Sequence, residues 1–499
     1  MTRGGWGVKC PAQGENTFSC DGSPTYFLLV LALTPNPSLT PAERFALDLL
    51  VDLSAVLPYP GSTDVVRVDV SDAAELRTLS ALRARNWGIT VSEGVVTLDR
   101  GLLAFTIDVA FAAVEQRSLA ADRFNRVPSS ETPLVSAQAE REPVISIAGQ
   151  ALASAVRAAA GQRPYCSIDP WPRGRTWAVA LSHDLDVVQW WPAFTSLRLL
   201  ELTKRRQLVR ALRVIGAAAF TGGRDVVWRG IRSLLDTESE HQVRSTWFVL
   251  CGSPTFATAR AGDLTYSPES ELARRILRAI AEGGHEIGLH GSFATSDDHS
   301  LFPAQRDRLQ ALVGGVTGVR QHYLRMRPDS TPRGMAKGGF RYDSTFGYAD
   351  RNGFRLGTAD VVPLWDVDAD ASTQIDEAPF TWMDRALSKY RGVEDPDRWI
   401  DDALALADAC RDVNGLWVGI WHPNLTPALG FPDAPTAYRR LVSSLSEREP
   451  WFAPLGEIVT WRQTRRSTRA TGVRPDGSII VDAKGPVVIR DAAGRAIDA

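Results

Sequence analysis

An alternation of apolar strands with long helical patterns begins at Trp177 and constrains the fold more than any other feature of the chain. Two of the helical patterns span residues 267–282 and 304–313, and the first opens with a serine and Pro268, which favour a helix start. The strands predicted around such patterns are 177–182, 245–250, 286–289, 358–364 and 415–421. Strands that alternate with helices predict an α/β fold, in which helices cover a parallel sheet or barrel.

The chain divides into four predicted segments. Residues 1–23 are predicted to be a disordered leader, and residues 24–165 a smaller N-terminal α/β domain of unknown role that has no catalytic cluster. Glycine and proline residues within 161–174 mark a boundary. The barrel is expected at 175–465, and a short β-like tail at 466–499.

A basic helical insertion interrupts the predicted barrel at residues 187–240. We interpret its positive charges as a solvated helix face, with a groove for an anionic polymer as the alternative. Leu208, Leu212 and Ile215 keep a helical spacing, which packing within the chain would explain.

Composition and charge exclude several classes of protein. The chain has 56 Lys and Arg residues against 58 Asp and Glu, a net charge of −2, so we expect no nucleic acid or acidic membrane surface as its main partner. Its five cysteines form no Cys-x-x-Cys pair, which argues against a disulfide framework or a zinc ribbon. The early apolar run at 26–33 is far shorter than the roughly 20 residues of a membrane-spanning helix. We therefore predict no transmembrane segment and a cytoplasmic location; the oligomeric state does not follow from the sequence.

The most informative motif is the segment Ser-His-Asp-Leu-Asp at 182–186, where an apolar strand ends in two carboxylates, Asp184 and Asp186. Polar side chains at the carboxyl ends of barrel strands point toward a shared mouth, where α/β enzymes carry out their chemistry. The alternative is a cap for the following helix. Two carboxylates and His183 exceed what one cap requires, so we favour a functional site.

Histidines stand at similar points in three later segments. His290 follows the short apolar strand 286–289, His322 lies where the next strand should begin, and His422 ends the strand at 415–421. His285 precedes its strand, and we expect it to be structural. Carboxylate and imidazole groups at neighbouring strand ends are typical of a divalent-metal site.

Taken together, these motifs resemble the polysaccharide deacetylase family of carbohydrate esterases, which has the NodB homology domain, and in particular a bacterial subgroup whose first motif is His-Asp-x-Asp. The resemblance covers roughly residues 177–460. The matching segments are SHDLD at 182–186, STWF at 245–248, GHEIGLH at 284–290, RQHYL at 320–324, YDSTFGYAD at 342–350, GFRLGT at 353–358 and WH at 421–422. The resemblance implies a distorted (β/α) barrel.

It also implies a role for each matching residue. Asp184 matches the catalytic base, and Arg320 the arginine that holds it. Asp186 and His290 match metal ligands, although Asp186 is displaced by one residue from the usual adjacent Asp-Asp pair. His422 matches the general acid that protonates the leaving amine. The implied cofactor is one divalent metal ion, with zinc expected, which activates the attacking water and stabilises the oxyanion.

One position departs from the family pattern. The second metal histidine usually stands four residues after the first, and Ala294 occupies that position here. Three interpretations stay open: His322 supplies the third ligand, water molecules fill the position, or the site has degenerated and no longer hydrolyses.

The substrate contacts predicted beside the mouth are Tyr342, Asp343, Trp421 and Asn424, since aromatic faces suit sugar rings. A tight turn capped by Asp343 is the alternative for the motif at 342–350. The leading hypothesis is a metal-dependent hydrolase that removes an acetyl group from an N-acetylated sugar or polysaccharide. The alternatives are an amidase on a small non-sugar amide, and a degenerate barrel that binds a glycan or a partner.

Overall fold

The computed structural model describes residues 7–8, 30–33, 38–56, 65–72, 74–161, 165–188, 193–221, 226–253, 266–473, 479–482, 488–490 and 496–497. The chain forms two compact units. The N-terminal unit comprises Met1–Ala113, Pro143–Thr176 and Thr460–Ala499, and the barrel unit comprises Val114–Glu142 and Trp177–Val459.

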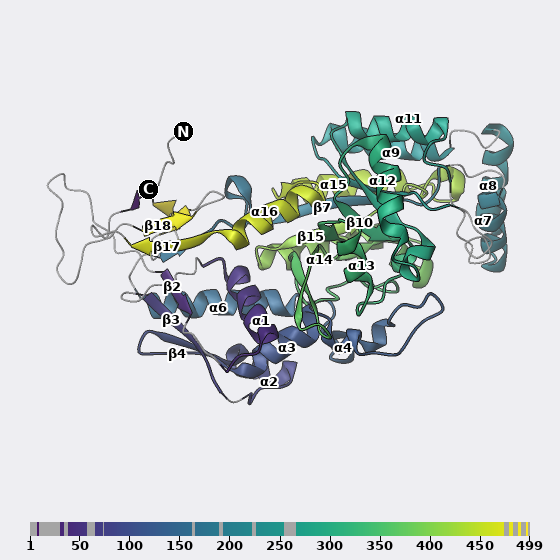
Figure 1. Ribbon diagram of the computed structural model, residues 1–499. Helices are drawn as coiled ribbons and strands as arrows, with labels where there is room; N and C mark the ends of the chain where they lie inside the picture. Colours follow the sequence, from purple (N-terminus) through teal and green to yellow (C-terminus); the bar gives the residue numbers. More distant parts are fainter. Residues whose placement is uncertain are drawn as a thin grey trace. The chain divides into compact units, whose positions relative to one another are not determined.

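A curled sheet of ten strands forms the centre of the barrel unit (Figure 1). Its order is β12-β13-β11-β10-β9-β8-β7-β15-β14, and β16 pairs with β7 beside this path. All of its pairs are parallel except β12 with β13. The strands are β7 (Ala178–Leu185), β8 (Thr246–Leu250), β9 (Glu286–Gly291), β10 (Gly318–Gln321), β11 (Tyr342–Asp343), β12 (Val362–Asp366), β13 (Ala371–Glu377), β14 (Trp382–Met383), β15 (Leu416–Ile420) and β16 (Trp451–Phe452). The α/β class and the parallel sheet of a distorted (β/α) barrel are thus confirmed.

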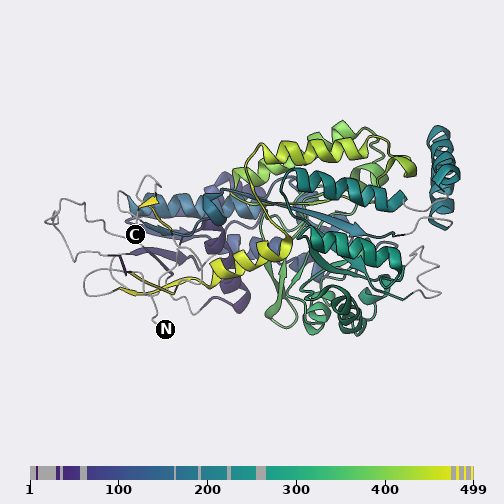
Figure 2. The same ribbon diagram turned by 90° about the horizontal axis from the view of Figure 1, so that it is seen from above.

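Burial explains why these segments form strands. Every residue of β7, β8 and β15 is buried, because helices cover the sheet (Figures 1 and 2). The covering helices are α9 (Val226–Glu240), α11 (Glu271–Glu282), α12 (Leu301–Val313), α13 (Thr331–Lys337), α14 (Pro396–Asp412) and α15 (Ala434–Ser446). The strand expected at 358–364 begins later, as β12, because the chain turns at Gly357, whose φ of 63° favours glycine.

The basic insertion forms α7 (Ala193–Lys204), α8 (Leu208–Thr221) and α9. Internal packing does not account for the apolar residues that the sequence singled out in α8, because Leu208, Leu212 and Ile215 are 62%, 68% and 49% exposed. The helix α7 is held by Arg198, whose Nε donates to the carbonyl oxygen of Leu429 at 3.1 Å.

The N-terminal unit contains a four-stranded sheet with the order β2-β3-β5-β4 and two three-stranded sheets. The four strands are β2 (Val30–Leu33), β3 (Val65–Val70), β4 (Ile89–Ser92) and β5 (Val95–Leu98), with α1 (Pro41–Ser54), α3 (Arg100–Ala110) and α6 (Val144–Ala160) among the helices of the unit. The tail contributes β17 (Arg469–Val473), β18 (Ile479–Asp482), β19 (Val488–Arg490) and β20 (Ala496–Ile497). Of these, β18 pairs with β17 and β1 (Gly7–Val8), and β19 pairs with β20 and β6 (Tyr165–Ser167). Apart from β1, the predicted leader at 1–23 lies outside the described residues.

The segment Val114–Glu142 belongs to the barrel unit, although the predicted boundary grouped it with the N-terminal domain. Arg355 pairs with the buried carboxylate of Glu115, with Nε 3.1 Å from Oε2. The amide of Phe354 donates to the carbonyl oxygen of Glu140 at 2.7 Å. These long-range contacts have no local signal in the sequence. Among the described helices, none has both the length and the apolar character that a membrane crossing requires.

Candidate active site

Four strand ends bring the predicted site residues together at one edge of the sheet. The strands β10, β9, β8, β7 and β15 are consecutive neighbours and run parallel, so their carboxyl ends lie at the same edge. A pocket of about 450 Å³ opens there, and Asp184, Asp186, His290, His322 and His422 all line it.

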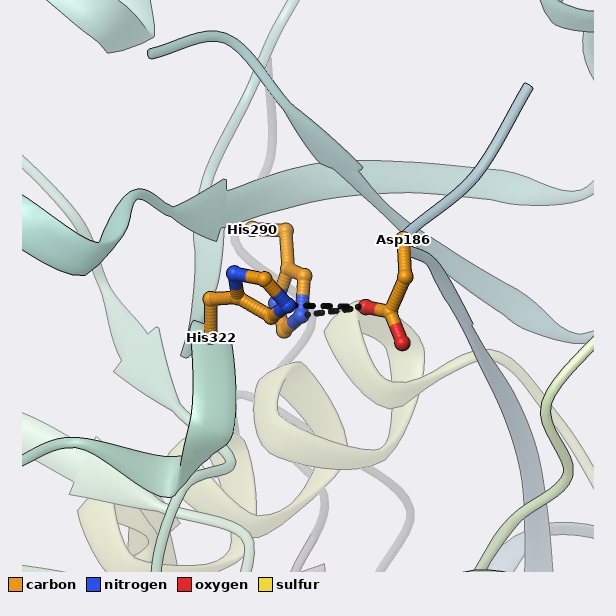
Figure 3. Close-up of side chains that lie close together, drawn as sticks. All are labelled: Asp186, His290 and His322. Carbon is orange, nitrogen blue, oxygen red and sulfur yellow. Dashed lines mark ion pairs between the residues drawn. The ribbon is translucent and has the colours of Figure 1, made fainter. Parts of the chain in front are cut away.

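Asp186, His290 and His322 form a candidate metal centre (Figure 3). The Nε2 atoms of His290 and His322 lie 3.2 Å and 3.5 Å from the same Oδ1 of Asp186. The strand β10 ends at Gln321, immediately before His322. The chain then turns sharply, since Tyr323 has a φ of 60°. Ala294 lies in a short 3-10 helix, Phe293–Ser296, and offers no ligand atom.

The chemistry of these donors fits a divalent cation. Nδ1 of His290 donates to the carbonyl oxygen of Arg320 at 2.8 Å, so in the neutral imidazole Nε2 carries a lone pair toward Asp186. Oδ1 of Asp186 is buried and accepts no hydrogen bond. Burial by itself would raise the pKa of Asp186, but the neighbouring histidines hold it far below its usual value. An oxygen and a nitrogen lone pair that face each other in this way are suited to hold a cation between them. One carboxylate with two imidazoles is a set that zinc accepts.

Asp184 is held by an arginine on the opposite side from this centre. Nη1 of Arg320 donates to Oδ1 of Asp184 at 2.8 Å and to Oγ of Ser182 at 2.9 Å, and Arg320 is completely buried. Oδ2 of Asp184 lies 4.0 Å from Nε2 of His290. Burial would raise the pKa of Asp184, but the charge of Arg320 and of nearby histidines lowers it below its usual value. Asp184 is therefore ionised at neutral pH and can accept a proton.

His422 is held by Asp384, which the sequence analysis missed. Nδ1 of His422 lies 2.7 Å from Oδ1 of Asp384, and the backbone amide of His422 donates to Oδ2 at 2.6 Å. Burial would lower the pKa of His422, but the negative charge of Asp384 and its hydrogen bond raise it above the usual value. Asp384 therefore favours the protonated ring, whose Nε2 lies 3.9 Å from Oδ2 of Asp186. Its position in the sequence could have revealed Asp384, because it directly follows the short buried strand β14, as Asp186 follows β7.

Of the four predicted substrate contacts, Asn424 is the one among the residues that line the pocket. Tyr342 and Asp343 are buried in β11, and the hydroxyl of Tyr342 donates to Oε1 of Glu286 at 2.9 Å. Trp421 is 3% exposed and packs against other aromatic rings, with Tyr438 at 5.1 Å between centroids. Alternate residues of a strand face opposite sides of the sheet, and the sequence pattern did not reveal which side meets the mouth.

His183 and His285 belong to a buried polar network behind the site, in agreement with the structural role expected for His285. Nε2 of His183 lies 2.8 Å from Oε1 of Glu238, and its Nδ1 donates to the carbonyl oxygen of Trp421 at 2.7 Å. Nδ1 of His285 accepts the backbone amide of Ser245 at 3.0 Å. The hydrogen bond from His183 to Trp421 therefore ties the end of β7, which carries Asp184, to the chain just before His422.

No protein-family model matches the sequence, and no curated protein matches it significantly. Several solved structures do match. The chain is similar to polysaccharide deacetylases. A protein assigned as a polysaccharide deacetylase from Mycobacterium smegmatis is 24% identical, with a TM-score of 0.41, over 61% of this chain and 96% of that chain.

Two further structures are more distant. The chitin deacetylase of Colletotrichum lindemuthianum is 13% identical, with a TM-score of 0.31, over 61% of this chain and 91% of that chain. The peptidoglycan deacetylase PdaC of Bacillus subtilis is 12% identical, with a TM-score of 0.28, over 60% and 95%. Because these similarities are low, the function has to follow from the side chains of this chain itself.

Proposed function

We propose that the chain is a metal-dependent hydrolase that removes an acetyl group from an N-acetylated sugar or polysaccharide. The proposal rests on three groups of side chains that meet at one pocket. They are the carboxylate of Asp184 bound to Arg320, the candidate metal centre, and the imidazole of His422 bound to Asp384. Amide hydrolysis needs a base for water, an electrophile for the carbonyl and an acid for the amine.

Each residue has a defined task in this reaction. Asp186, His290 and His322 would hold a divalent ion, expected to be zinc, which would supply Lewis-acid polarisation of the amide carbonyl and of the attacking water. Asp184 accepts the proton of that water at Oδ2, while Arg320 keeps Oδ1 in place. His422 donates its Nε2 proton to the leaving amine, and Asp384 keeps the ring oriented and protonated.

The position of His322 supports the first of the three interpretations of Ala294, in which His322 is the third ligand. The intact pairs Asp184–Arg320 and His422–Asp384 favour an active site over a degenerate barrel, because each pair buries a charge that has no structural need to border the pocket. A cytoplasmic location and a carbohydrate substrate remain predictions.

Acetate release by the purified full-length chain tests the proposal. We expect acetate from N-acetylated sugars, loss of this activity after chelation, and its return when Zn²⁺ is added. Ammonia release from small non-sugar amides, measured in parallel, would instead identify an amidase. Acetate release that survives complete removal of metal would contradict the metal-dependent mechanism.

A further inference from the structure

The lining of the pocket carries a set of cations, which we call the cationic wall. Five of its lining residues carry a positive side chain other than histidine: Arg126, Arg198, Arg205, Arg385 and Lys389. The acidic lining residues are Asp184, Asp186 and Glu201. Asp184 is already paired with Arg320, and Asp186 belongs to the candidate metal centre. Glu201 is therefore the one lining carboxylate that is not already assigned to Arg320 or to the candidate metal centre.

Two of the five cations have no acidic partner among the described residues. Arg126 pairs with Asp122 outside the lining, with Nη2 2.6 Å from Oδ2. Arg198 and Arg205 share Glu201, at 2.7 Å and 3.2 Å. The described residues contain no carboxylate within ion-pair distance of Arg385 or Lys389. Longer-range attraction comes from Glu201, which Arg198 and Arg205 already share, and for Lys389 also from Asp186. Neither cation therefore has a carboxylate of its own among the described residues.

Arg385 and Lys389 form one turn of chain that Arg205 holds in place. Lys389 lies in the turn Ala386–Tyr390, which Arg385 immediately precedes. Nη2 of Arg205 donates to the carbonyl oxygen of Lys389 at 3.1 Å, and Nη1 to that of Ser388 at 3.4 Å. Both side chains are partly exposed toward the pocket. Burial and the nearby charge of Arg385 lower the pKa of Lys389 to about 8, as expected where like charges are crowded together.

We infer that the substrate is an N-acetylated sugar that also carries a phosphate or diphosphate group, which Arg385 and Lys389 bind. This inference rests on the proposed function and names its substrate class. A phosphate offers at least three acceptor oxygens and about two negative charges, which match several cations on one wall. A substrate with a single carboxylate would need only one arginine. A neutral glycan would pair with neither Arg385 nor Lys389.

Two sources could supply this chemistry: a soluble nucleotide-linked sugar or a polyprenyl-diphosphate-linked sugar. The exposed apolar face of α8, formed by Leu208, Leu212 and Ile215, gives a reason to include the lipid-linked source in the test. This helix packs beside the short helix Pro427–Leu429, and Leu429 lines the pocket.

Binding of inorganic diphosphate tests the anion site without any hydrolysis. The full-length chain is titrated with diphosphate by calorimetry in the presence of a chelator, so that binding through a metal ion is excluded. We expect saturable binding that weakens as salt rises and falls roughly 10-fold for each of Arg385→Gln and Lys389→Gln. The matched control is Arg398→Gln, which removes an exposed cation of α14 outside the pocket lining. No binding, or equal weakening in the control, would overturn the inference.

Acetate release then identifies the source. The substrates are UDP-N-acetylglucosamine, a polyprenyl-diphosphate-linked N-acetylglucosamine in detergent, and free N-acetylglucosamine. We expect kcat/KM for at least one phosphorylated substrate to exceed that for the free sugar by roughly 10-fold or more. In the Arg385→Gln/Lys389→Gln double variant, the ratio of these two kcat/KM values should fall to about 1.

The two proposals can fail separately. Acetate release with no preference for phosphorylated substrates would refute the phosphate inference and leave the hydrolase in place. Diphosphate binding without acetate release from any substrate would refute the hydrolase and leave the anion site in place. A preference for N-acetylated uronic acids over phosphorylated sugars would also overturn the inference.

Discussion

Asp184 and Asp186 stand two residues apart at the end of β7, and their neighbours give them different tasks. Asp184 is 4% exposed and bound to Arg320, whereas the side chain of Asp186 is 22% exposed and faces two imidazoles. The proposed function accordingly assigns Asp184 the role of base and Asp186 that of metal ligand, because the groups around each carboxylate differ. Two predictions separate these tasks.

Replacing Asp184 with Asn should abolish hydrolysis and leave the metal bound. An amide can still accept the hydrogen bond from Arg320 but cannot take up the proton of water, so we expect the rate of acetate release to fall about 10²- to 10⁴-fold. Metal content by mass spectrometry should match that of the parent chain. Asp368→Asn, at an exposed position, is the control; full activity in the Asp184 variant would reject its assignment as the base.

Single replacement of Asp186, His290 or His322 with Ala should strip the metal. Each removes one of three ligand atoms that face one another, whereas His285→Ala should keep the metal and lower stability through its buried network. Ala294→His should change metal affinity little, because His322 already fills the third position. Titration of the metal-free chain with Zn²⁺ measures all these variants. Parent-like affinity in His322→Ala would show that His322 is no ligand.

At the scale of single elements, α7 and α8 differ in how they are held. Leu202 of α7 is fully buried, whereas Leu212 of α8 is 68% exposed. We expect Leu202→Ala to reduce the free energy of unfolding by roughly 2–5 kcal/mol, and Leu212→Ala to change it by no more than about 0.5 kcal/mol. Urea denaturation measures both. An equal loss in the two variants would mean that the apolar face of α8 is packed after all.

The pairing of β11 with β13 places two carboxyl groups, Asp343 and Glu377, directly opposite each other. Both are fully buried, and burial raises the pKa of Asp343 to about 6 and also raises that of Glu377, which the charge of Asp343 raises further. The folded chain therefore keeps a proton that the unfolded chain releases near pH 4. Since the folded state binds more protons in this window, the free energy of unfolding should fall as pH rises from about 4 to about 6.

Asp343→Asn should reduce that fall by roughly 2–3 kcal/mol, because the amide does not titrate. Urea denaturation of the parent and the variant at several pH values between 4 and 8 measures the difference. Asp368→Asn should keep the slope of the parent. An unchanged slope in the Asp343 variant would contradict the shared buried proton.

At the scale of the whole molecule, the barrel unit is discontinuous in sequence. Its segment Val114–Glu142 is joined to the rest of the unit through the buried pair of Glu115 and Arg355. Glu115→Gln would leave a buried guanidinium without its charge partner, so we expect a loss of about 3–5 kcal/mol in the free energy of unfolding. The control is Glu282→Gln, at an exposed position of α11. Equal stability of the two variants would show that the segment contributes little to the unit.

The sequence by itself determined the α/β class, the strands that end in Asp184, Asp186, His290 and His422, and the family resemblance. These features are local: buried strands require apolar runs, and a polar residue at the end of such a run is visible without any knowledge of its neighbours. His322 was expected where the next strand begins, but β10 ends at Gln321, so His322 follows the strand and reaches the same edge as His290.

Only the tertiary structure decided which side chains meet. Asp384 reaches His422 across two adjacent strands, and the cationic wall combines residues from α7 with the turn at Ala386–Tyr390, far apart in sequence. Tyr342 and Trp421 were expected at the mouth but are buried, because the facing of a side chain depends on register and on the helices that cover each side of the sheet. Pairing, register and burial are long-range properties, and a local pattern of residue types does not contain them.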